Sequence, residues 1–391
     1  MVLALLVLGC TPDVTHLYAA ERNTALAVAS EVPAGWKPDA ALGIASPDLA
    51  KALRAVVRRA VSEGKPIQLP LALGITATLK PDLDLKKINI EATSDCAACF
   101  SIQLALEGQA RWEAGPASGS VPISAAASAI IAVSVRDGAI IEARPRRVDS
   151  LRVEVPTLGN LRVNASGPLQ DWLRGLIVDR LAPVRIATLD TTALPIRDLR
   201  LSTTNDQLVV ELLTDVPGAV PLRALPAPAQ GVEMVMSEAV ITGLARRAAF
   251  QAGTLQMDVA VDPRKLSVDG ASFVLDLRLW RLVGRGWYRD YRVNGDVDVE
   301  VRANGAPRLR LNAKTADETA ASPGALLVDP LAALFQAKIL DAIVNAMDRS
   351  LPGQTQQRVA GVSLAAKMTA ARGLDEALHV YGTLDVAASN P

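Results

Sequence analysis

One order of secondary-structure patterns occurs twice along this chain, and the repetition restricts the possible folds more than any other feature. Each copy begins with an amphipathic helix pattern, continues through runs of alternating apolar and polar residues, and adds a second helix pattern and a few returning strands. Ser46 is expected to cap the first helix, with Pro47 in its first turn. The four helices are predicted to begin at Ser46, Ser166, Ser237 and Asp329 and to be ended by Gly64, Pro183, Gly253 and Pro352.

Alternating apolar and polar residues, which are typical of strands with one buried face, fill most of the remaining chain. In the first copy strands are predicted at 67–78, 82–92, 100–112, 130–135 and 139–155, with returning strands at 186–201 and 207–213. In the second copy they are predicted at 255–261, 273–282, 291–303 and 308–313, with returning strands at 357–369 and 377–386. Between the copies, Asp215–Gln230 contains four prolines and is predicted to be a stiff linker. Two similar domains in tandem are therefore expected.

One predicted hairpin can be specified residue by residue. Acidic residues alternate with valines before Asn304, and basic residues alternate with leucines after Ala306. A three-residue loop, Asn304–Ala306, would place Glu300 opposite Arg310 and Asp296 opposite Lys314. The acidic residues could be read as calcium ligands or as an acid–base group, but the cations expected across from them favour a solvated face.

The first ten residues resemble an export signal. Val2–Gly9 is apolar and uncharged and is too short to span a bilayer. Val7–Cys10 resembles the lipobox of bacterial lipoproteins, in which the chain is cleaved before the cysteine and its sulfur receives a diacylglycerol. The resemblance implies a signal over 1–10, lipidation of Cys10 and a tether over 11–34. It also implies export and anchoring to the outer membrane, on the periplasmic face or at the cell surface. The alternative is an apolar N-terminus with an incidental cysteine.

Cys96 and Cys99 stand between two predicted strands. Export would permit a disulfide between them, which would staple the turn. Free thiols, or a redox or metal site, are the alternatives. A redox centre needs the pair at a helix N-terminus in a βαβ unit, and a zinc site needs more ligands than these two thiols supply.

Composition argues for binding rather than catalysis. Lys and Arg together number 41, as do Asp and Glu, and aromatic residues make up only 3% of the chain. Balanced charge and few stacking rings argue against nucleic acid as a partner. No GxSxG, P-loop, GxGxxG or HExxH motif is found, and His379 is the one histidine outside the predicted tether. The protein is therefore predicted not to be an enzyme and to need no metal or cofactor. Arg144–Arg147 and Arg246–Arg247 are short basic clusters that could meet lipid headgroups or lie in water.

The segment Gly231–Leu255, with the sequence GVEMVMSEAVITGLARRAAFQAGTL, carries a family resemblance. It is similar to the opening of the second domain in the TULIP superfamily of lipid-binding proteins: a strand, S-E-x-x-(I/L)-N-x-x-L, a helix and x-A-G-x-(L/F). Leu194–Leu201 with Gln207–Leu213 is similar to the family's return from helix to final strands. The resemblance implies an α+β fold of two tandem TULIP-like domains, 35–214 and 231–391, joined by a Pro-rich linker, 215–230. Each domain would be a curved antiparallel sheet wrapped against long amphipathic helices.

Aliphatic side chains on these helices predict an apolar seam between helix and sheet. Burying one acyl methylene contributes about 0.8 kcal/mol, so a lipid chain could be held without polar contacts. The candidate lining residues are Leu53, Val57, Trp172, Leu176, Leu334, Phe335 and Ile343, and plain core packing is the alternative for each. The expected function is lipid binding or lipid transfer by an envelope lipoprotein. The alternatives are a scaffold or adaptor for a protein partner, without a lipid cavity, and a component of a toxin complex.

Overall fold

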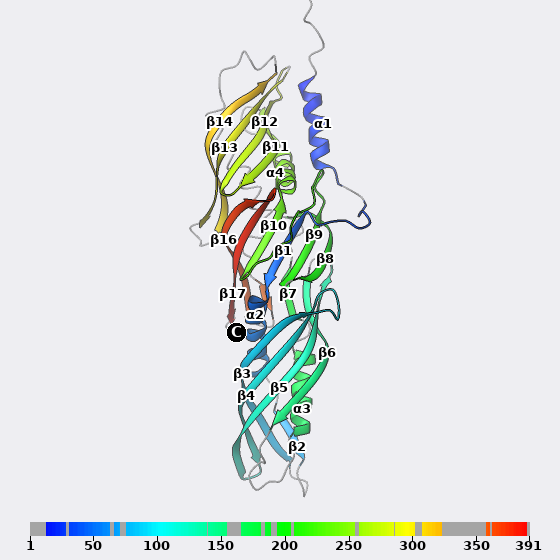
Figure 1. Ribbon diagram of the computed structural model, residues 1–391, viewed down its shortest axis with the longest axis vertical. Helices are drawn as coiled ribbons and strands as arrows, with labels where there is room; N and C mark the ends of the chain where they lie inside the picture. Colours follow the sequence, from blue (N-terminus) through cyan, green and yellow to red (C-terminus); the bar gives the residue numbers. More distant parts are fainter. Residues whose placement is uncertain are drawn as a thin grey trace, which may run out of the picture.

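The computed structural model describes residues 13–28, 31–62, 66–70, 76–138, 140–154, 166–180, 184–188, 194–204, 207–254, 258–284, 286–301, 307–322, 357–359 and 362–388. These residues form an elongated, mostly β molecule in which three antiparallel sheets follow one another along the long axis (Figure 1). The helix predicted from Asp329 lies outside them.

The central sheet takes strands from both copies of the repeat. Its order is β15 (Gln357–Val359), β16 (Val362–Leu374), β17 (Ala377–Ala388), β10 (Val232–Ser237), β1 (Ala40–Ala45), β9 (Gln207–Thr214) and β8 (Ile196–Thr204). Two hydrogen bonds flank the β1–β10 pair. The Ala45 N–H donates to the Gly231 carbonyl at 3.1 Å, and the Ser237 N–H donates to the Asp39 carbonyl at 3.0 Å. One continuous sheet therefore joins the two halves of the chain.

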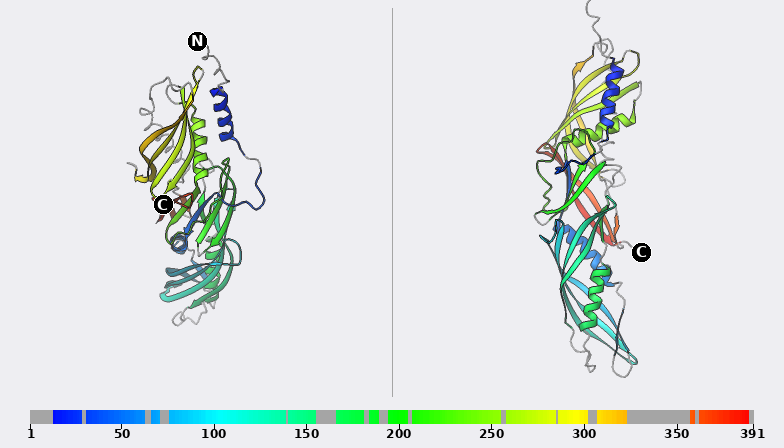
Figure 2. Two further views of the ribbon diagram at one scale, coloured as in Figure 1. Left: turned by 45° about the horizontal axis from the view of Figure 1, so that its top comes forward. Right: turned by 90° about the vertical axis from the view of Figure 1, so that its right-hand side faces the viewer.

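A larger and a smaller sheet lie at the two ends of the molecule (Figures 1 and 2). The six-stranded sheet is β2 (Ile67–Pro70), β3 (Thr76–Thr93), β4 (Cys99–Ala114), β5 (Ala117–Arg136), β6 (Ile140–Glu154) and β7 (Val184–Thr188). It packs against α2 (Ser46–Ser62) and against α3 (Ser166–Gly175), which continues as the π-helical turn η2 (Leu176–Arg180). The four-stranded sheet is β11 (Val259–Asp269), β12 (Ser272–Arg281), β13 (Trp287–Val301) and β14 (Pro307–Ala321), and α4 (Glu238–Ala252) packs against β11.

The helices expected at Ser46, Ser166 and Ser237 are present, but they begin in different ways. Ser237 caps α4, because its hydroxyl accepts the Val240 N–H at 3.3 Å. The expected cap at Ser46 is wrong: its buried hydroxyl has no hydrogen-bond partner among the described residues. Asp48 instead anchors the first turn of α2, accepting the Gly231 N–H that precedes β10. The start of α2 is thus tied to the second copy of the repeat.

The Pro-rich linker packs against the central sheet. Within 215–230 the structure contains no helix or strand. Pro226 and Pro228 lie over Gly43 of β1, where a Cβ atom would stand 2.9 Å from each proline. Val216 lies in the same way against Gly243 of α4, whose Cβ would stand 2.1 Å from a Val216 methyl carbon. Both glycines are therefore needed for the close approach of the linker.

The predicted hairpin register is wrong by two residues. Glu300 stands opposite Arg308, not Arg310, and the pairing ends with Val301 opposite Pro307. The expected ion pairs nevertheless form along diagonals: Arg310 reaches Glu300 at 3.3 Å, and Lys314 reaches Asp296 at 2.6 Å. Long side chains reach a diagonal neighbour as readily as a direct one, so the charge pattern does not determine the register.

The expectation of a tether over 11–34 is wrong for Val14–Leu26, which form α1. Asp13 caps this helix by accepting the Thr15 N–H at 3.0 Å. The helix packs against α4 beside the four-stranded sheet (Figure 1). It is therefore part of the folded body.

Candidate functional site

The predicted seam residues that the structure describes belong to one apolar cluster. Val57 of α2 and Leu176 of η2 are buried, and Leu53 and Trp172 are half-buried against the same cluster. Leu334, Phe335 and Ile343 lie outside the described residues. The helices α2 and α3 and the turn η2 also present aliphatic residues to the cluster: Leu49, Val56, Val61, Leu169, Leu173 and Ile177.

The sheet side of this seam has unusually small side chains on β5. Ala125, Ala127 and Ala129 point inward and are buried, whereas Ala126 between them is exposed on the outer face. Each inward alanine is flanked by a larger aliphatic residue of β4 and of β6, as Ala127 is by Leu104 and Leu151. Small residues in the middle of a sheet face leave more room above it than leucine or isoleucine would.

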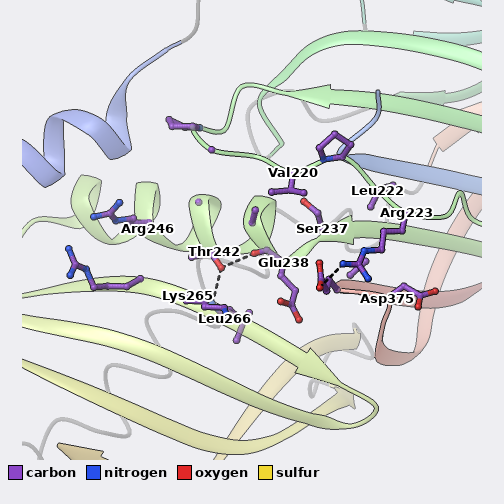
Figure 3. A pocket seen from close by; sticks show the side chains of 18 residues that line it. Val220, Leu222, Arg223, Ser237, Glu238, Thr242, Arg246, Lys265, Leu266 and Asp375 are labelled. Carbon is purple, nitrogen blue, oxygen red and sulfur yellow. Dashed lines mark hydrogen bonds and ion pairs between the residues drawn. The ribbon is translucent and has the colours of Figure 1, made fainter. Parts of the chain in front are cut away.

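A second candidate is a pocket at the junction of the central and four-stranded sheets, with a volume of about 310 Å³ (Figure 3). Its walls come from the linker, the start of α4, β11 and the turn between β16 and β17. Thr242 joins two of these walls, because its hydroxyl donates to the Glu238 carbonyl at 2.7 Å and accepts the Leu266 N–H at 2.9 Å. None of the four predicted lining residues that the structure describes is in this pocket.

The charged side chains of the junction pocket are mostly paired. Arg223 meets Glu376 across it at 2.7 Å. Arg246 and Arg264 face Asp262 of β11, which has no exposed surface. Lys265 has no ion pair with any residue that the structure describes. The pocket therefore has a mixed lining of both charges, unlike the aliphatic seam.

The one histidine expected in the folded body, His379, lies in a buried pair beneath the linker. Its Nδ1 donates to Glu233 Oε1 at 2.8 Å, since a carboxylate can only accept, and both side chains are 7% exposed. The other oxygen of Glu233 accepts the Ala227 N–H of the linker at 2.8 Å. Burial raises the pKa of Glu233, but the hydrogen bonds from His379 and Ala227 outweigh it, so the pKa lies below its usual value. The pair therefore fastens the linker to β10 and β17.

Glu233→Gln is expected to lower the free energy of unfolding by about 1–3 kcal/mol at pH 7, because a charge-assisted pair is lost. A carboxylate with a lowered pKa stabilises the fold above the pKa of the unfolded chain and stops doing so as pH falls through its folded value. The difference in the free energy of unfolding between wild type and variant should therefore narrow as pH falls below about 4. Urea unfolding at a series of pH values measures this difference. Burial raises the pKa of Asp39, but Asp39 is unchanged in the variant. Its contribution to the pH dependence of stability is therefore the same in both proteins and cancels in the comparison. A gap that is constant with pH would contradict this role.

Cys96 and Cys99 form a disulfide in the turn between β3 and β4. The carbonyl of Ala98 accepts the Val133 N–H of β5, and that of Ala97 accepts the Thr203 N–H of β8, both at 2.9 Å. The turn therefore connects the six-stranded sheet with the edge of the central sheet. Cys10 lies outside the described residues.

The basic clusters are largely neutralised by local partners. Arg144 pairs with Glu142 at 2.9 Å, and Arg147 pairs with Asp95 at 3.3 Å. Arg247 donates to the Asp215 carbonyl at 2.6 Å. Across the described residues, no group of three or more His, Cys, Asp or Glu is arranged to hold a metal ion, and no helix is long and apolar enough to cross a membrane.

No protein-family model and no curated protein matches the chain. Among solved structures, a lipopolysaccharide-binding protein aligns with 90% of this chain and 99% of its own, at 13% identity and a TM-score of 0.41. P47 of Clostridium botulinum E1 aligns with 90% of this chain and 100% of its own, at 8% identity and a TM-score of 0.41. Both alignments extend over the two halves of the chain.

Proposed function

We propose that this protein binds lipids, holding acyl chains in the seam between α2, α3 and the inner face of the six-stranded sheet. The observation that supports this most is the lining: aliphatic residues on both helices face a sheet whose β5 presents Ala125, Ala127 and Ala129. Such a surface offers an apolar chain contact over its length and no hydrogen bond. About ten buried methylenes would contribute about 8 kcal/mol, a micromolar affinity before the cost of ordering the chain.

Replacing Ala127 with phenylalanine tests where the lipid lies. If the seam holds an acyl chain, the ring takes its place, so bound lipid should fall severalfold while the melting temperature changes little. Native mass spectrometry of gently purified protein measures the lipid, and scanning fluorimetry measures the melting temperature. Ala126→Phe, one residue along and on the outer face, is the matched control and should keep its lipid.

Two results would refute the lipid-binding proposal. One is wild-type protein that carries no lipid in repeated preparations. The other is an Ala127→Phe variant destabilised by about 1–3 kcal/mol or more, the usual cost of overfilling a packed core. Either would favour the adaptor alternative, in which the seam is filled by side chains and the outer faces bind a protein partner.

We further propose that the protein is exported and anchored by a lipid on Cys10. The support is the apolar run before this cysteine and its likeness to a lipobox. Replacing Cys10 with serine is expected to move the protein from the membrane fraction to the soluble fraction. An unchanged distribution in fractionated cells would rule the anchor out.

A further inference from the structure

Helix α1 is held on the C-terminal half by a group of aromatic rings. The Tyr18 ring lies 5.4 Å from that of Phe250 on α4 and 5.9 Å from that of Trp280 on β12, and Trp280 in turn lies 5.6 Å from Tyr288. Trp280 and Phe250 are among the largest fully buried side chains of the described chain. Aromatic residues make up only 3% of the sequence, yet several of them gather under this one short helix. Their concentration there indicates that α1 packs specifically against the C-terminal half.

One turn further along α1, a carboxylate completes the attachment. Glu21 accepts hydrogen bonds from Arg246 of α4 and Arg264 of β11, and both arginines also face the buried Asp262. Burial raises the pKa of Glu21, but the Arg246 and Arg264 cations outweigh that effect and lower it. The half-buried setting makes these pairs stronger than pairs in open solvent.

The first turn of α1 lies at the outer end of the molecule. Val14 approaches the turn between β12 and β13, where a Cβ on Gly286 would stand 3.1 Å from the Val14 Cβ. Val283 in the same turn is 51% exposed. From there α1 runs toward the central sheet (Figures 1 and 2). The direction of the chain entering α1 is therefore set by the folded body.

We propose that α1 is a clamp that fixes how the body stands on a lipid membrane, with the β12–β13 end of the four-stranded sheet facing the bilayer and the six-stranded sheet pointing away. The inference rests on the proposed anchor at Cys10. Asp13, the cap of α1, is three residues from Cys10, so their Cα atoms are at most about 11 Å apart. A long flexible tether would leave the orientation free, whereas a docked helix this close to the anchor does not.

The orientation can be measured on vesicles without relying on cellular lipidation or on lipid in the seam. Cys10 is the one cysteine of the three outside the Cys96–Cys99 disulfide, so the full chain can be coupled there to a maleimide-bearing lipid in phosphatidylcholine vesicles. A donor dye is placed at position 283, or in a separate sample at 115 in the β4–β5 turn, through an azide-bearing amino acid. Energy transfer to an acceptor lipid should be severalfold greater from 283 than from 115.

Reversing the charge of Glu21 separates the clamp from the anchor. Glu21→Arg sets a third cation against Arg246 and Arg264, so α1 should detach and the ratio of transfer from the two positions should fall toward one. Asn23→Arg adds a cation on the exposed side of α1 and should leave the ratio unchanged. Tyr18→Ser, which removes the ring contacts instead, should act like Glu21→Arg. Circular dichroism checks that each variant is folded.

Equal transfer from positions 283 and 115 in the wild-type protein would overturn the proposal, as would a ratio that survives both Glu21→Arg and Tyr18→Ser. Neither outcome would bear on whether Cys10 is lipidated in cells or whether the seam binds lipid, because the coupling is chemical. Conversely, failure of the Cys10→Ser fractionation would remove the anchor while leaving the attachment of α1 in place.

Discussion

Arg246→Met is expected to lower the free energy of unfolding by about 3–5 kcal/mol, because it leaves a buried carboxylate without its main partner. Arg246 Nη2 lies 3.1 Å from Asp262 Oδ2, and Asp262 has no exposed surface. Arg264 stays 3.6 Å from the same carboxylate and keeps the loss near the lower end of that range. Chemical unfolding followed by circular dichroism measures the change.

The double variant Arg246→Met/Asp262→Leu separates the cost of the stranded charge from the cost of losing the arginine. Replacing both members of a buried pair by apolar residues of similar size is often close to neutral, so most of the lost stability should return. Should the double variant be no more stable than the single one, the loss would come from the packing of the Arg246 stem instead.

Gly373→Ala is the second change expected to be severe, at about 3 kcal/mol or more. A Cβ on Gly373 would stand 2.1 Å from the Val268 carbonyl oxygen, which is backbone and cannot swing away. Overfilling of this kind costs about 1–3 kcal/mol. It would also break the two hydrogen bonds between Gly373 and Gly270, at 3.0 and 2.7 Å, which join β16 to the turn between β11 and β12.

The adjacent Leu374→Ala is the matched control for Gly373→Ala. Leu374 is 54% exposed, so its truncation should cost about 0.5 kcal/mol or less. Hydrogen exchange should also quicken at the β11–β12 turn in Gly373→Ala alone, since the bridge between the central and four-stranded sheets opens. Equal unfolding midpoints for the two variants would show that the backbone accommodates the extra carbon.

Local signals in the sequence predicted the local structure well. Pro47 and Pro168 favour a helix start and Gly253 favours a helix stop, each through its own backbone preferences. The first turns of α2 and α3 contain these prolines, and α4 ends just before this glycine. The first part of β5 is not predicted, because its inward face is mostly alanine, which produces little contrast with the serines and the single proline on the other face. The long strand was therefore predicted only over 130–135.

Features that depend on distant partners were not predictable in this way. Only Val14, Tyr18 and Ala25 give α1 an apolar stripe, and the partner that fixes Glu21 lies 225 residues along the chain. The junction pocket has the same origin, since its walls come from the linker, α4, β11 and the β16–β17 turn. The shared central sheet also depends on the pairing of β1 with β10, which no periodicity encodes.

The central sheet has a consequence for how the chain is made. During synthesis β1 emerges early, yet one of its neighbours, β9, ends at Thr214 and the other, β10, must itself wait for β17, which ends at Ala388. The central sheet therefore cannot be completed until β17 has left the ribosome. Contacts so far apart in sequence also form slowly. Such timing is compatible with the export proposed above, because the central sheet stays incomplete until β17 has been made.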